Sequence, residues 1–173
     1  SRLLVSKGIR EYVGAAREYK KNNSNARFLL AGWIDKNPDS ISKKELDQWI
    51  KDGDIEFLGK LNSPKEVKEV ISNCSVYILP SYREGTPRTV LEAMSIGRPI
   101  ITTDVPGCRQ TTIESYNGIL VPSKSLFGLL EAINFFLNHP EKILEMGKNS
   151  RELAIKKFDA EIVNNAIFSE MTR

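Results

Sequence analysis

Histidine and cysteine are scarce in this sequence, and their scarcity excludes several kinds of site. The chain of 173 residues has one histidine and two cysteines. His139 stands alone in an Asn-His-Pro segment between two helix-like stretches, so neither a histidine metal centre nor a catalytic triad can be assembled around it. Cys74 and Cys108 fit a reducing cytoplasm better than a disulfide framework. We expect Cys74 to be buried beside a strand, while Cys108, in a turn-rich loop, is open to burial or exposure.

Other absences narrow the range of functions further. No apolar run approaches the roughly 20 residues that span a bilayer, and no signal-peptide pattern precedes the first strand-like segment. The formal net charge is only +3 and no basic block carries interleaved aromatic residues, which argues against a nucleic-acid partner. Neither a G-x-G-x-x-G fingerprint nor a Walker A loop is present. With 40% hydrophobic residues, residues 1–173 are predicted to form one domain with one substantial core.

Strand-like and helix-like segments alternate along the chain. This alternation predicts an α/β fold in which a Rossmann-like parallel sheet carries helices on both faces. Ser63-Pro64-Lys65-Glu66 has the pattern of a capped helix start with proline at the first helical position. Strands are expected at residues 3–5, 27–31, 55–58, 76–79, 99–103 and 119–121, and helices are expected at 9–16, 46–50, 64–71, 87–96, 126–133, 143–144 and 162–167.

The most informative segment runs from residue 83 to residue 94. Thr86 and Pro87 predict a helix that begins at Pro87, because threonine is a favoured capping residue and proline is preset for the first helical position. The backbone N–H groups of Arg88 and Thr89 would then be free in the first turn, at the positive end of the helix dipole. Such a helix start is suited to binding a phosphate.

Two glutamates, Glu84 and Glu92, stand eight positions apart around this helix start. Glu92 is one helical turn from Arg88 and Thr89, and Glu84 approaches from the preceding loop. Carboxylates accept hydrogen bonds and gain nothing from a phosphate, so both should meet hydroxyl groups. Phosphate donors flanked by hydroxyl acceptors predict a nucleotide sugar as the ligand. The alternatives are a solvated helix glutamate and a loop ion pair of Glu84 with Arg83 or Arg88.

The Glu-x7-Glu element with Gly-x-Pro inside it resembles the donor-binding motif of retaining GT-B glycosyltransferases of family 4 (group 1). The resemblance runs nearly end to end and is closest to the bacterial branch that builds capsule, O-antigen and lipid-linked oligosaccharides. It implies that the chain is the C-terminal half of a GT-B fold. Further elements follow in the family's order at residues 2–8, 37–39, 49, 55–59, 79–85, 103–109 and 117–122.

The resemblance implies a role for each site residue. Arg2 and Lys7 would lie at the carboxyl end of the first strand, where open α/β sheets bind ligands, and would stabilise the charge that grows on the departing diphosphate. Glu84 would touch hydroxyls of the transferred sugar and Glu92 would hold the ribose diol. Arg2, Lys7 and Glu84 are thus the expected catalytic residues. The expected donor-binding residues are Arg2, Lys7, Glu84, Gly85, Thr86, Arg88, Thr89 and Glu92, and Arg109 is an open candidate at the cleft mouth.

The resemblance also implies partners and limits. The donor would be a UDP-sugar, with no cofactor and no metal, and Asp52-Gly53-Asp54 is interpreted as a turn rather than a metal motif. Residues 1–173 would be the donor-binding domain, and an N-terminal acceptor domain, absent from this chain, would handle a glycan or lipid-linked acceptor. The full-length protein would be cytoplasmic, with peripheral association at the inner face of the membrane. The alternatives are a GT-B UDP-sugar epimerase and a non-catalytic nucleotide-binding α/β module.

Overall fold

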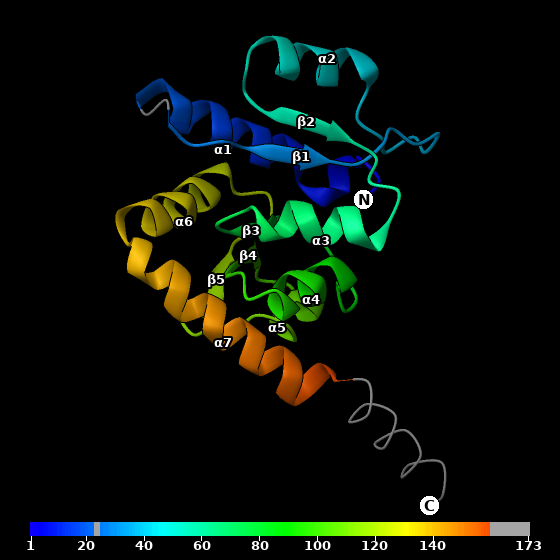
Figure 1. The fold of residues 1–173 in the computed structure, drawn as a ribbon. Coiled ribbons are helices and arrows are strands. Elements are labelled where there is room, and N and C mark those ends of the chain that lie inside the picture. Colours follow the sequence, from blue (N-terminus) through cyan, green and yellow to red (C-terminus); the bar gives the residue numbers. More distant parts are fainter. Residues whose placement is uncertain (23–24, 160–173) are drawn as a thin grey trace, which may run out of the picture.

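The computed structural model describes residues 1–22 and 25–159. Parallel strands alternate with helices that cover both faces, which confirms the predicted α/β class (Figure 1). In chain order the elements are a 3-10 turn η1 (Val5–Lys7), α1 (Ile9–Asn22), β1 (Leu29–Ala31), α2 (Lys43–Lys51), β2 (Glu56–Gly59), α3 (Pro64–Ser72), β3 (Tyr77–Leu79), α4 (Arg88–Ser95), β4 (Ile100–Thr103), α5 (Pro106–Arg109), β5 (Gly118–Val121), α6 (Leu126–Asn138) and α7 (Pro140–Phe158).

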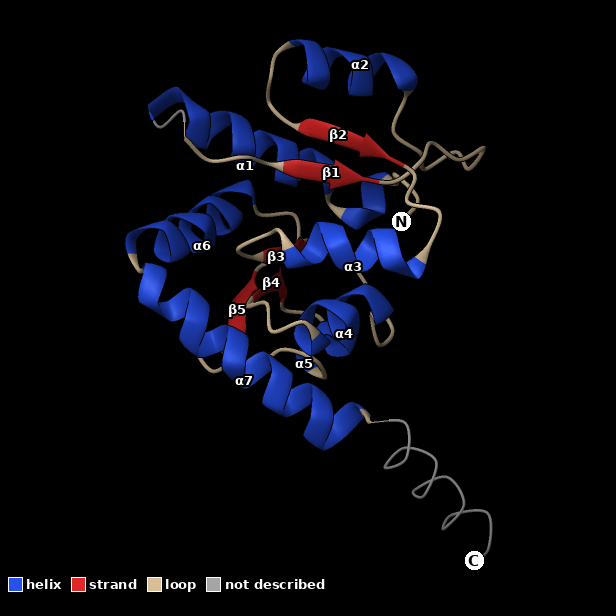
Figure 2. Cartoon of the chain, viewed as in Figure 1, coloured by secondary structure: helices blue, strands red, loops and turns tan. Residues whose placement is uncertain are grey.

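The strands of the described residues form two parallel ladders, one of β1 and β2 and one in the order β3-β4-β5 (Figure 2). Ile101, on the central strand β4, is the register partner of Ile78 on one side and of Ile119 on the other. All four residues of β4 are buried. The strand begins with two isoleucines and ends with two buried threonines, whose hydroxyls donate to the backbone carbonyls of Leu79 and Ser81.

The strand expected at residues 3–5 does not form a ladder. Arg2 and Leu4 make isolated bridges, to Trp33 and to Ser40, and the chain then enters the 3-10 turn at Val5. The predicted strand does not form because Arg2 and Leu4 pair with two different segments, so no run of paired residues develops before the turn begins.

This short first segment nevertheless connects the two ladders. On one side the N–H of Leu3 donates to the carbonyl of Trp33 at 2.9 Å, just beyond β1. On the other side the N–H of Tyr82, just beyond β3, donates to the carbonyl of Ser6 at 2.9 Å. The carboxyl ends of β1 and β3 are therefore tied to the same few residues of the amino-terminal segment.

Helix α3 begins at Pro64, as the capping pattern predicts. The Ser63 side chain accepts the N–H of Glu66, but the Glu66 carboxylate reaches the N–H of Asn62 at 2.9 Å rather than that of Ser63. Helix α2 has the full reciprocal arrangement, in which Ser42 and Glu45 each accept the other's N–H. Both caps satisfy donors that a helix start would otherwise leave free.

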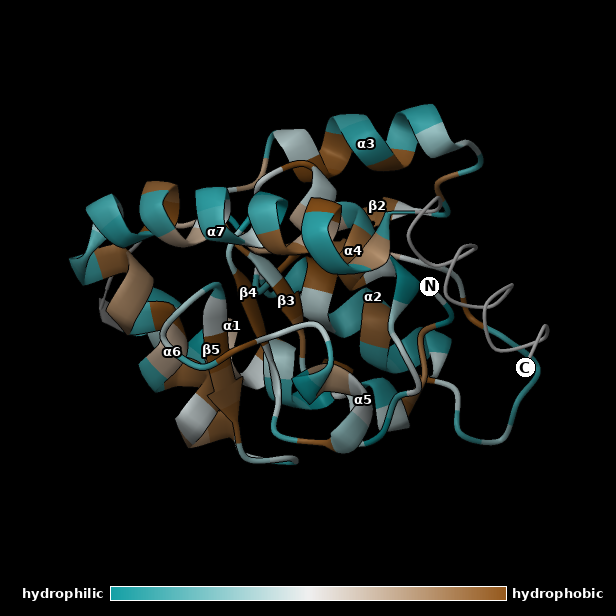
Figure 3. Cartoon of the chain, turned by 90° about the horizontal axis from the view of Figure 1, so that it is seen from below, coloured by the Kyte–Doolittle hydropathy of each residue, from teal (hydrophilic) through white to brown (hydrophobic). Residues whose placement is uncertain are grey.

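The core consists of two clusters on opposite sides of the β3-β4-β5 ladder. The larger one packs α1 and α6 together and includes the fully buried Leu129 and Phe136. The smaller one packs α4 against α7 and includes Val90 and Met94. Figure 3 shows the apolar strands enclosed between helices whose outer faces are hydrophilic. Burial of each such side chain contributes on the order of 1.5–3 kcal/mol.

Strand β5 lies at the end of its ladder and has a strand neighbour only on the β4 side within the described part of the chain. On its other side the Glu114 carboxylate accepts the N–H of Leu120 at 2.6 Å. One backbone donor of this edge is therefore satisfied by a side chain from the preceding turn instead of by another strand.

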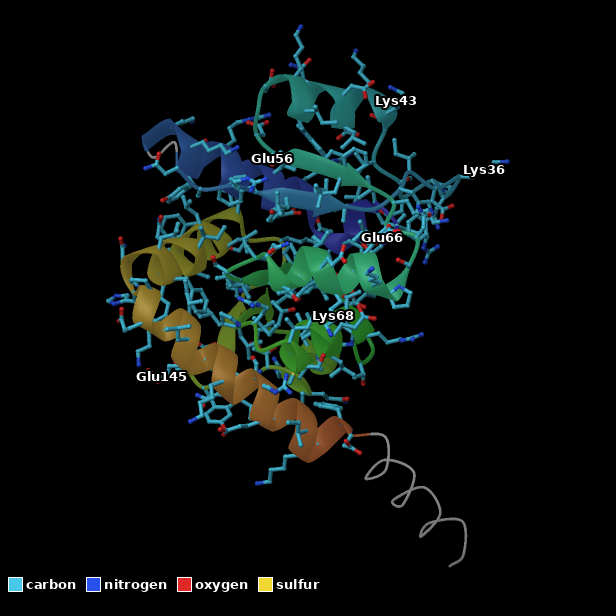
Figure 4. All side chains as sticks on the ribbon, in the orientation of Figure 1. Lys36, Lys43, Glu56, Glu66, Lys68 and Glu145 are labelled. Carbon is cyan, nitrogen blue, oxygen red and sulfur yellow. The ribbon has the colours of Figure 1, made fainter. Side chains whose placement is uncertain are left out.

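The remaining sequence expectations have mixed outcomes. Cys108 is fully buried, and Cys74 is half-buried rather than buried, with its thiol pKa raised mainly by desolvation. The helix expected at 162–167 lies outside the described residues. None of the helices that the structure describes has the length and apolar character needed to cross a bilayer. Figure 4 shows Lys36, Lys43 and Glu145 pointing outward from separate segments.

Candidate functional site

Helix α4 begins at Arg88, and its N-cap residue is Pro87 rather than Thr86. The prediction that Thr86 caps this helix is therefore wrong. The Thr86 hydroxyl instead donates to Oε1 of Gln110 at 3.0 Å, next to the end of α5. The extended conformation of Pro87, with ψ of 107°, carries the preceding loop toward α5 and away from the helix start.

The first turn of α4 keeps free backbone donors, as expected from the sequence. No side chain caps the helix, and within the described residues the N–H groups of Arg88 and Thr89 have no acceptor. The first bonds of this turn come later, where Val90 and Leu91 both donate to the carbonyl of Pro87. Two free N–H groups at the positive end of an eight-residue helix can receive an anion. Their role in holding a phosphate stays a prediction.

The residues expected to act on the diphosphate and on the sugar meet directly. Lys7 Nζ lies 2.5 Å from Glu84 Oε1, and the two side chains are 27% and 13% exposed. Lys7 ends the turn η1, and Glu84 lies in the loop between β3 and α4, so the pair joins the amino-terminal turn to the segment that follows β3. The sequence alternatives for the partner of Glu84 were Arg83 and Arg88, and the structure gives Lys7 instead.

Arg2 is held more loosely than Lys7. Its guanidinium Nη1 lies 3.7 Å from an Asp35 carboxylate oxygen, and half of its side chain is exposed. An exposed pair at this distance contributes little to stability, so Arg2 can turn toward a ligand at low cost.

The charges of both glutamates act on a tyrosine of β3. The pKa of Tyr77, on β3, is raised to about 12, first by burial and then by the charges of Glu92 and Glu84, while a hydrogen bond with Thr89 lowers it. Glu92 itself is exposed. The sequence analysis did not single out Tyr77. The period of two along β3 could have indicated it, because Tyr77 and Leu79 share the strand face that packs on α4.

The loop that carries Glu84 rests on a glycine. A methyl group added at Gly107 would lie 2.2 Å from the carbonyl oxygen of Glu84 and 2.1 Å from that of Gly85. Only glycine allows this approach of α5 to the loop. Gly85 and Thr86 are themselves exposed. Gly107 lies in the 103–109 element, which the sequence analysis used as a family marker without assigning it a contact.

The turn η1, which carries Lys7, is held by hydrogen bonds to the Asp39 carboxylate. The Asp39 carboxylate accepts the N–H of Ser6 at 3.1 Å and also the Ser6 hydroxyl. The bond from that hydroxyl, followed by the one from the N–H, lowers the pKa of Asp39. The structure thus gives the last residue of the Asn-Pro-Asp element a task that the sequence did not reveal, namely fixing the turn η1.

The remaining polar candidates have partners of their own. Asp54 accepts a hydrogen bond from Arg17 Nη2 at 2.6 Å, and the adjacent Gly53 has φ of +73°, so Asp52 to Asp54 is the predicted turn. Arg109 pairs with Asp104 at 2.5 Å. His139 is exposed at the start of α7, as expected. Within the described ranges, no three metal-binding side chains come together.

An open groove adjoins Glu92. It lies between α3 and α4 and has a volume of about 420 Å³. Its walls mix apolar side chains with two cations, and the lining residues are Pro64, Val67, Lys68, Glu92, Ser95, Ile96 and Arg151.

The parallel sheet with helices on both faces, and the cluster at its strand ends, define the class of GT-B glycosyltransferase domains. HepE of Anabaena, solved in complex with UDP, superposes over 99% of this chain and 47% of its own with a TM-score of 0.86 at 22% identity. The C-terminal domain of the group 1 glycosyl transferase LpcC from Francisella tularensis superposes over 90% of this chain and 81% of its own, with a TM-score of 0.79 at 22% identity.

The family model described as glycosyl transferases group 1 matches residues 1–153, and the chain belongs to this family. A curated relative from Campylobacter jejuni is 31% identical over 163 residues, which cover 94% of this chain and 40% of the relative. Its name is N,N'-diacetylbacillosaminyl-diphospho-undecaprenol alpha-1,3-N-acetylgalactosaminyltransferase. The capsular polysaccharide glycosyltransferase CapM of Staphylococcus aureus is 24% identical over 94% of this chain. The chain spans 40% and 42% of the lengths of these two relatives.

Proposed function

We propose that this chain is the donor-binding domain of a retaining glycosyltransferase that transfers a sugar from a UDP-sugar in bacterial polysaccharide biosynthesis. The observation that carries the proposal is that the Lys7–Glu84 ion pair lies just before α4, whose first turn has free N–H groups and whose second turn carries Glu92. Cations and N–H donors suit a diphosphate, and carboxylates suit hydroxyls. The UDP bound to HepE and the capsule and lipid-linked activities named for the relatives support the choice of substrate.

The proposed roles follow the chemistry of the reaction. When the bond from the anomeric carbon to the diphosphate breaks, negative charge grows on the departing oxygen. Lys7, Arg2 and the N–H groups of Arg88 and Thr89 would stabilise that charge more than they stabilise the intact donor. Glu84 would hold hydroxyls of the sugar, Glu92 would hold the ribose diol, and the backbone of Gly85 and Thr86 would line the donor.

We further propose that the reaction requires no metal. The charge that a metal would supply is available from Lys7 and Arg2 at the strand ends. Asp52 and Asp54, which have the spacing of a metal motif, face Arg17 at 3.8 Å and 2.6 Å. UDP affinity should therefore be the same with EDTA and with added magnesium or manganese. A strict dependence on either ion would count against the GT-B mechanism and would favour Asp52 and Asp54 as metal ligands.

An acceptor domain outside this chain would complete the enzyme. The two relatives described above are more than twice the length of this chain. We propose that the remaining part binds a glycan or lipid-linked acceptor at the cytoplasmic face of the membrane. Transfer requires an acceptor hydroxyl held in attack geometry and a site closed to water, which one half of a cleft does not supply. The isolated chain should bind donor without transferring sugar, and transfer at the rate of the full-length protein would contradict this division of labour.

The primary experiment is a thermal-shift and calorimetry panel with UDP, GDP, ADP and their sugars, because a ligand that binds the native state raises its stability by mass action. Uridine nucleotides should give the largest shifts. A shift with adenine or guanine nucleotides alone would contradict the choice of base. Among the alternatives, an epimerase would form epimer from donor without acceptor, and a non-catalytic module would show neither transfer nor epimer formation in the full-length protein.

A further inference from the structure

Tyr82, in the loop between β3 and α4, is anchored at three points to elements far away in the sequence. Its N–H donates to the carbonyl of Ser6 at 2.9 Å, and its hydroxyl donates to Oε1 of Glu11 at 2.7 Å. The ammonium of Lys124, in the turn after β5, lies 5.0 Å from the centre of its ring. The side chain is thus fixed at both its polar end and its face.

The partner of the Tyr82 hydroxyl is an unusual carboxylate. Glu11 lies in the first turn of α1, and its second oxygen, Oε2, is buried without a hydrogen-bond partner in the described structure. A carboxylate in this environment depends strongly on the bonds that it does make, since an unsatisfied buried oxygen carries a desolvation cost. Within the described residues, the only hydrogen bond to the Glu11 carboxylate comes from Tyr82, so the bond is favourable for both side chains.

The same loop packs closely on the amino-terminal segment just before Tyr82. The backbone at Pro80 packs closely on Gly8. A methyl group added at Gly8 would lie 2.0 Å from the Pro80 carbonyl oxygen. Beyond Tyr82, Arg83 is exposed, and Glu84 then pairs with Lys7. Tyr82 is therefore the last side chain anchored to α1 before the carboxylate that the proposed function assigns to the sugar.

We propose that Tyr82 and Glu11 are positioning residues, which set the direction of the Glu84 carboxylate by tying its loop to the first turn of α1. This inference rests on the proposed function, because it concerns the use of Glu84 toward the donor sugar. Neither Tyr82 nor Glu11 needs to touch the donor. Their bond would restrict the loop so that the Glu84 carboxylate is already oriented when the donor arrives, which lowers the entropic cost of the sugar contact.

The test compares the affinities of this chain for UDP and for two probes, UDP-glucose and UDP-N-acetylgalactosamine, by calorimetry. In Tyr82→Phe the affinity for at least one UDP-sugar should fall roughly three- to tenfold while that for UDP changes by less than about twofold, as expected for the loss of one hydrogen bond. A purely structural role would lower the thermal midpoint and weaken UDP and its sugars equally.

Tyr12→Phe is the matched control, because it removes another tyrosine hydrogen bond from α1. The Tyr12 hydroxyl donates to the carbonyl of Leu29, at the start of β1 and away from the strand ends that carry the site. Tyr12→Phe should leave the ratio of the UDP-sugar to UDP affinities unchanged.

The Glu11 variants test the other end of the bond. Glu11→Gln keeps an acceptor oxygen and should retain the affinity ratio of the unaltered chain, whereas Glu11→Leu should reproduce the result of Tyr82→Phe. The double variant Tyr82→Phe/Glu11→Leu should be no worse than either single variant.

The outcomes separate the inference from the proposed function. If the unaltered chain binds neither UDP nor its sugars, the proposed function fails and the inference falls with it. If the unaltered chain binds them but the affinity ratio is the same in Tyr82→Phe and Glu11→Leu, the inference alone is overturned. Loss of the folded state in both variants would assign the pair to stability and would overturn the inference as well.

Discussion

Lys7 and Glu84 form a 2.5 Å ion pair although 77 positions separate them in the sequence. The cation proposed for the diphosphate is thus held by the carboxylate proposed for the sugar. In the absence of donor each neutralises the other, which limits the cost of keeping two partly buried charges at one site. A donor that offers a diphosphate to Lys7 and hydroxyls to Glu84 would compete with this pair at both ends.

Alanine substitution should separate the roles of the two glutamates. Glu92→Ala should weaken UDP and UDP-sugars alike, by roughly 1.5–3 kcal/mol, because a charge-assisted bond to the ribose serves both ligands. Glu84→Ala should weaken only the ligands that carry a sugar. Calorimetry with UDP and UDP-glucose provides the measurement. Glu131→Ala, on the exposed side of α6, is the control, and equal losses of both ligands in Glu84→Ala would remove its assigned role.

Substitution of Lys7 should reveal a diphosphate contact. Lys7→Ala should weaken UDP much more than uridine, and the difference should shrink as salt is added, because screening reduces the attraction between charges. Titrations at several salt concentrations measure both effects. Lys43→Ala, which removes an outward-pointing lysine from α2, should change neither affinity (Figure 4). A salt-independent loss, or an equal loss for uridine, would argue that Lys7 acts only through the conformation of the loop.

The close approach at Gly107 predicts a steric effect on the Glu84 loop. Because an added methyl group would lie 2.1 Å and 2.2 Å from two carbonyl oxygens, Gly107→Ala must displace the loop or α5. We expect a lower thermal midpoint and weaker binding of UDP-sugars. At Gly85 an added methyl group meets no atom within 4 Å, so Gly85→Ala is a control for thermal stability alone. An unchanged midpoint in Gly107→Ala would show that α5 yields without cost.

Acid should release the turn that presents Lys7. The pKa of Asp39 lies below its usual value of 3.8, first because of the bond from the Ser6 hydroxyl and then because of the Ser6 N–H. A lowered pKa in the folded state contributes stability that is present above the unfolded pKa and is lost as the pH falls through the folded one. The free energy of unfolding of Asp39→Asn should therefore lie below that of the unaltered chain by a constant amount above about pH 5, and the gap should close toward pH 2. Denaturant titrations across this range measure the gap, and a gap that persists at pH 2 would assign the effect to packing.

The alternation of strands and helices, and most of their positions, could be predicted from the sequence because local signals are strong there. The serine and proline at 63–64 fix the start of α3, and the run of β-branched residues at 100–103 favours β4. The strand predicted at residues 3–5 is wrong because their apolar pattern does not reveal how few ladder partners they have. The cap predicted at Thr86 is wrong because its hydroxyl has a competing partner, Gln110, that is distant in sequence.

The site could be predicted only in part for the same reason. Glu84, Glu92 and the helix start lie in one segment, so their proximity follows from helix geometry. The pairing of Lys7 with Glu84, the support of η1 by Asp39 and the anchor at Glu11 all join segments that are far apart. Such contacts depend on the complete topology, and no periodicity in the sequence reports them. The sequence alone therefore indicates which residues carry the chemistry better than it indicates which contacts hold those residues in place.

The Glu114 carboxylate at the edge of β5 has a consequence for the behaviour of this protein at high concentration. An unpaired strand edge is a template on which a second molecule can add its own strand, and sheet extension of this kind leads to aggregation. Here the N–H of Leu120 is already occupied, and an incoming backbone would meet a negative charge where it needs a free donor. Within the described part of the chain, the side chain of the turn before β5 thus discourages self-association at this edge of the sheet.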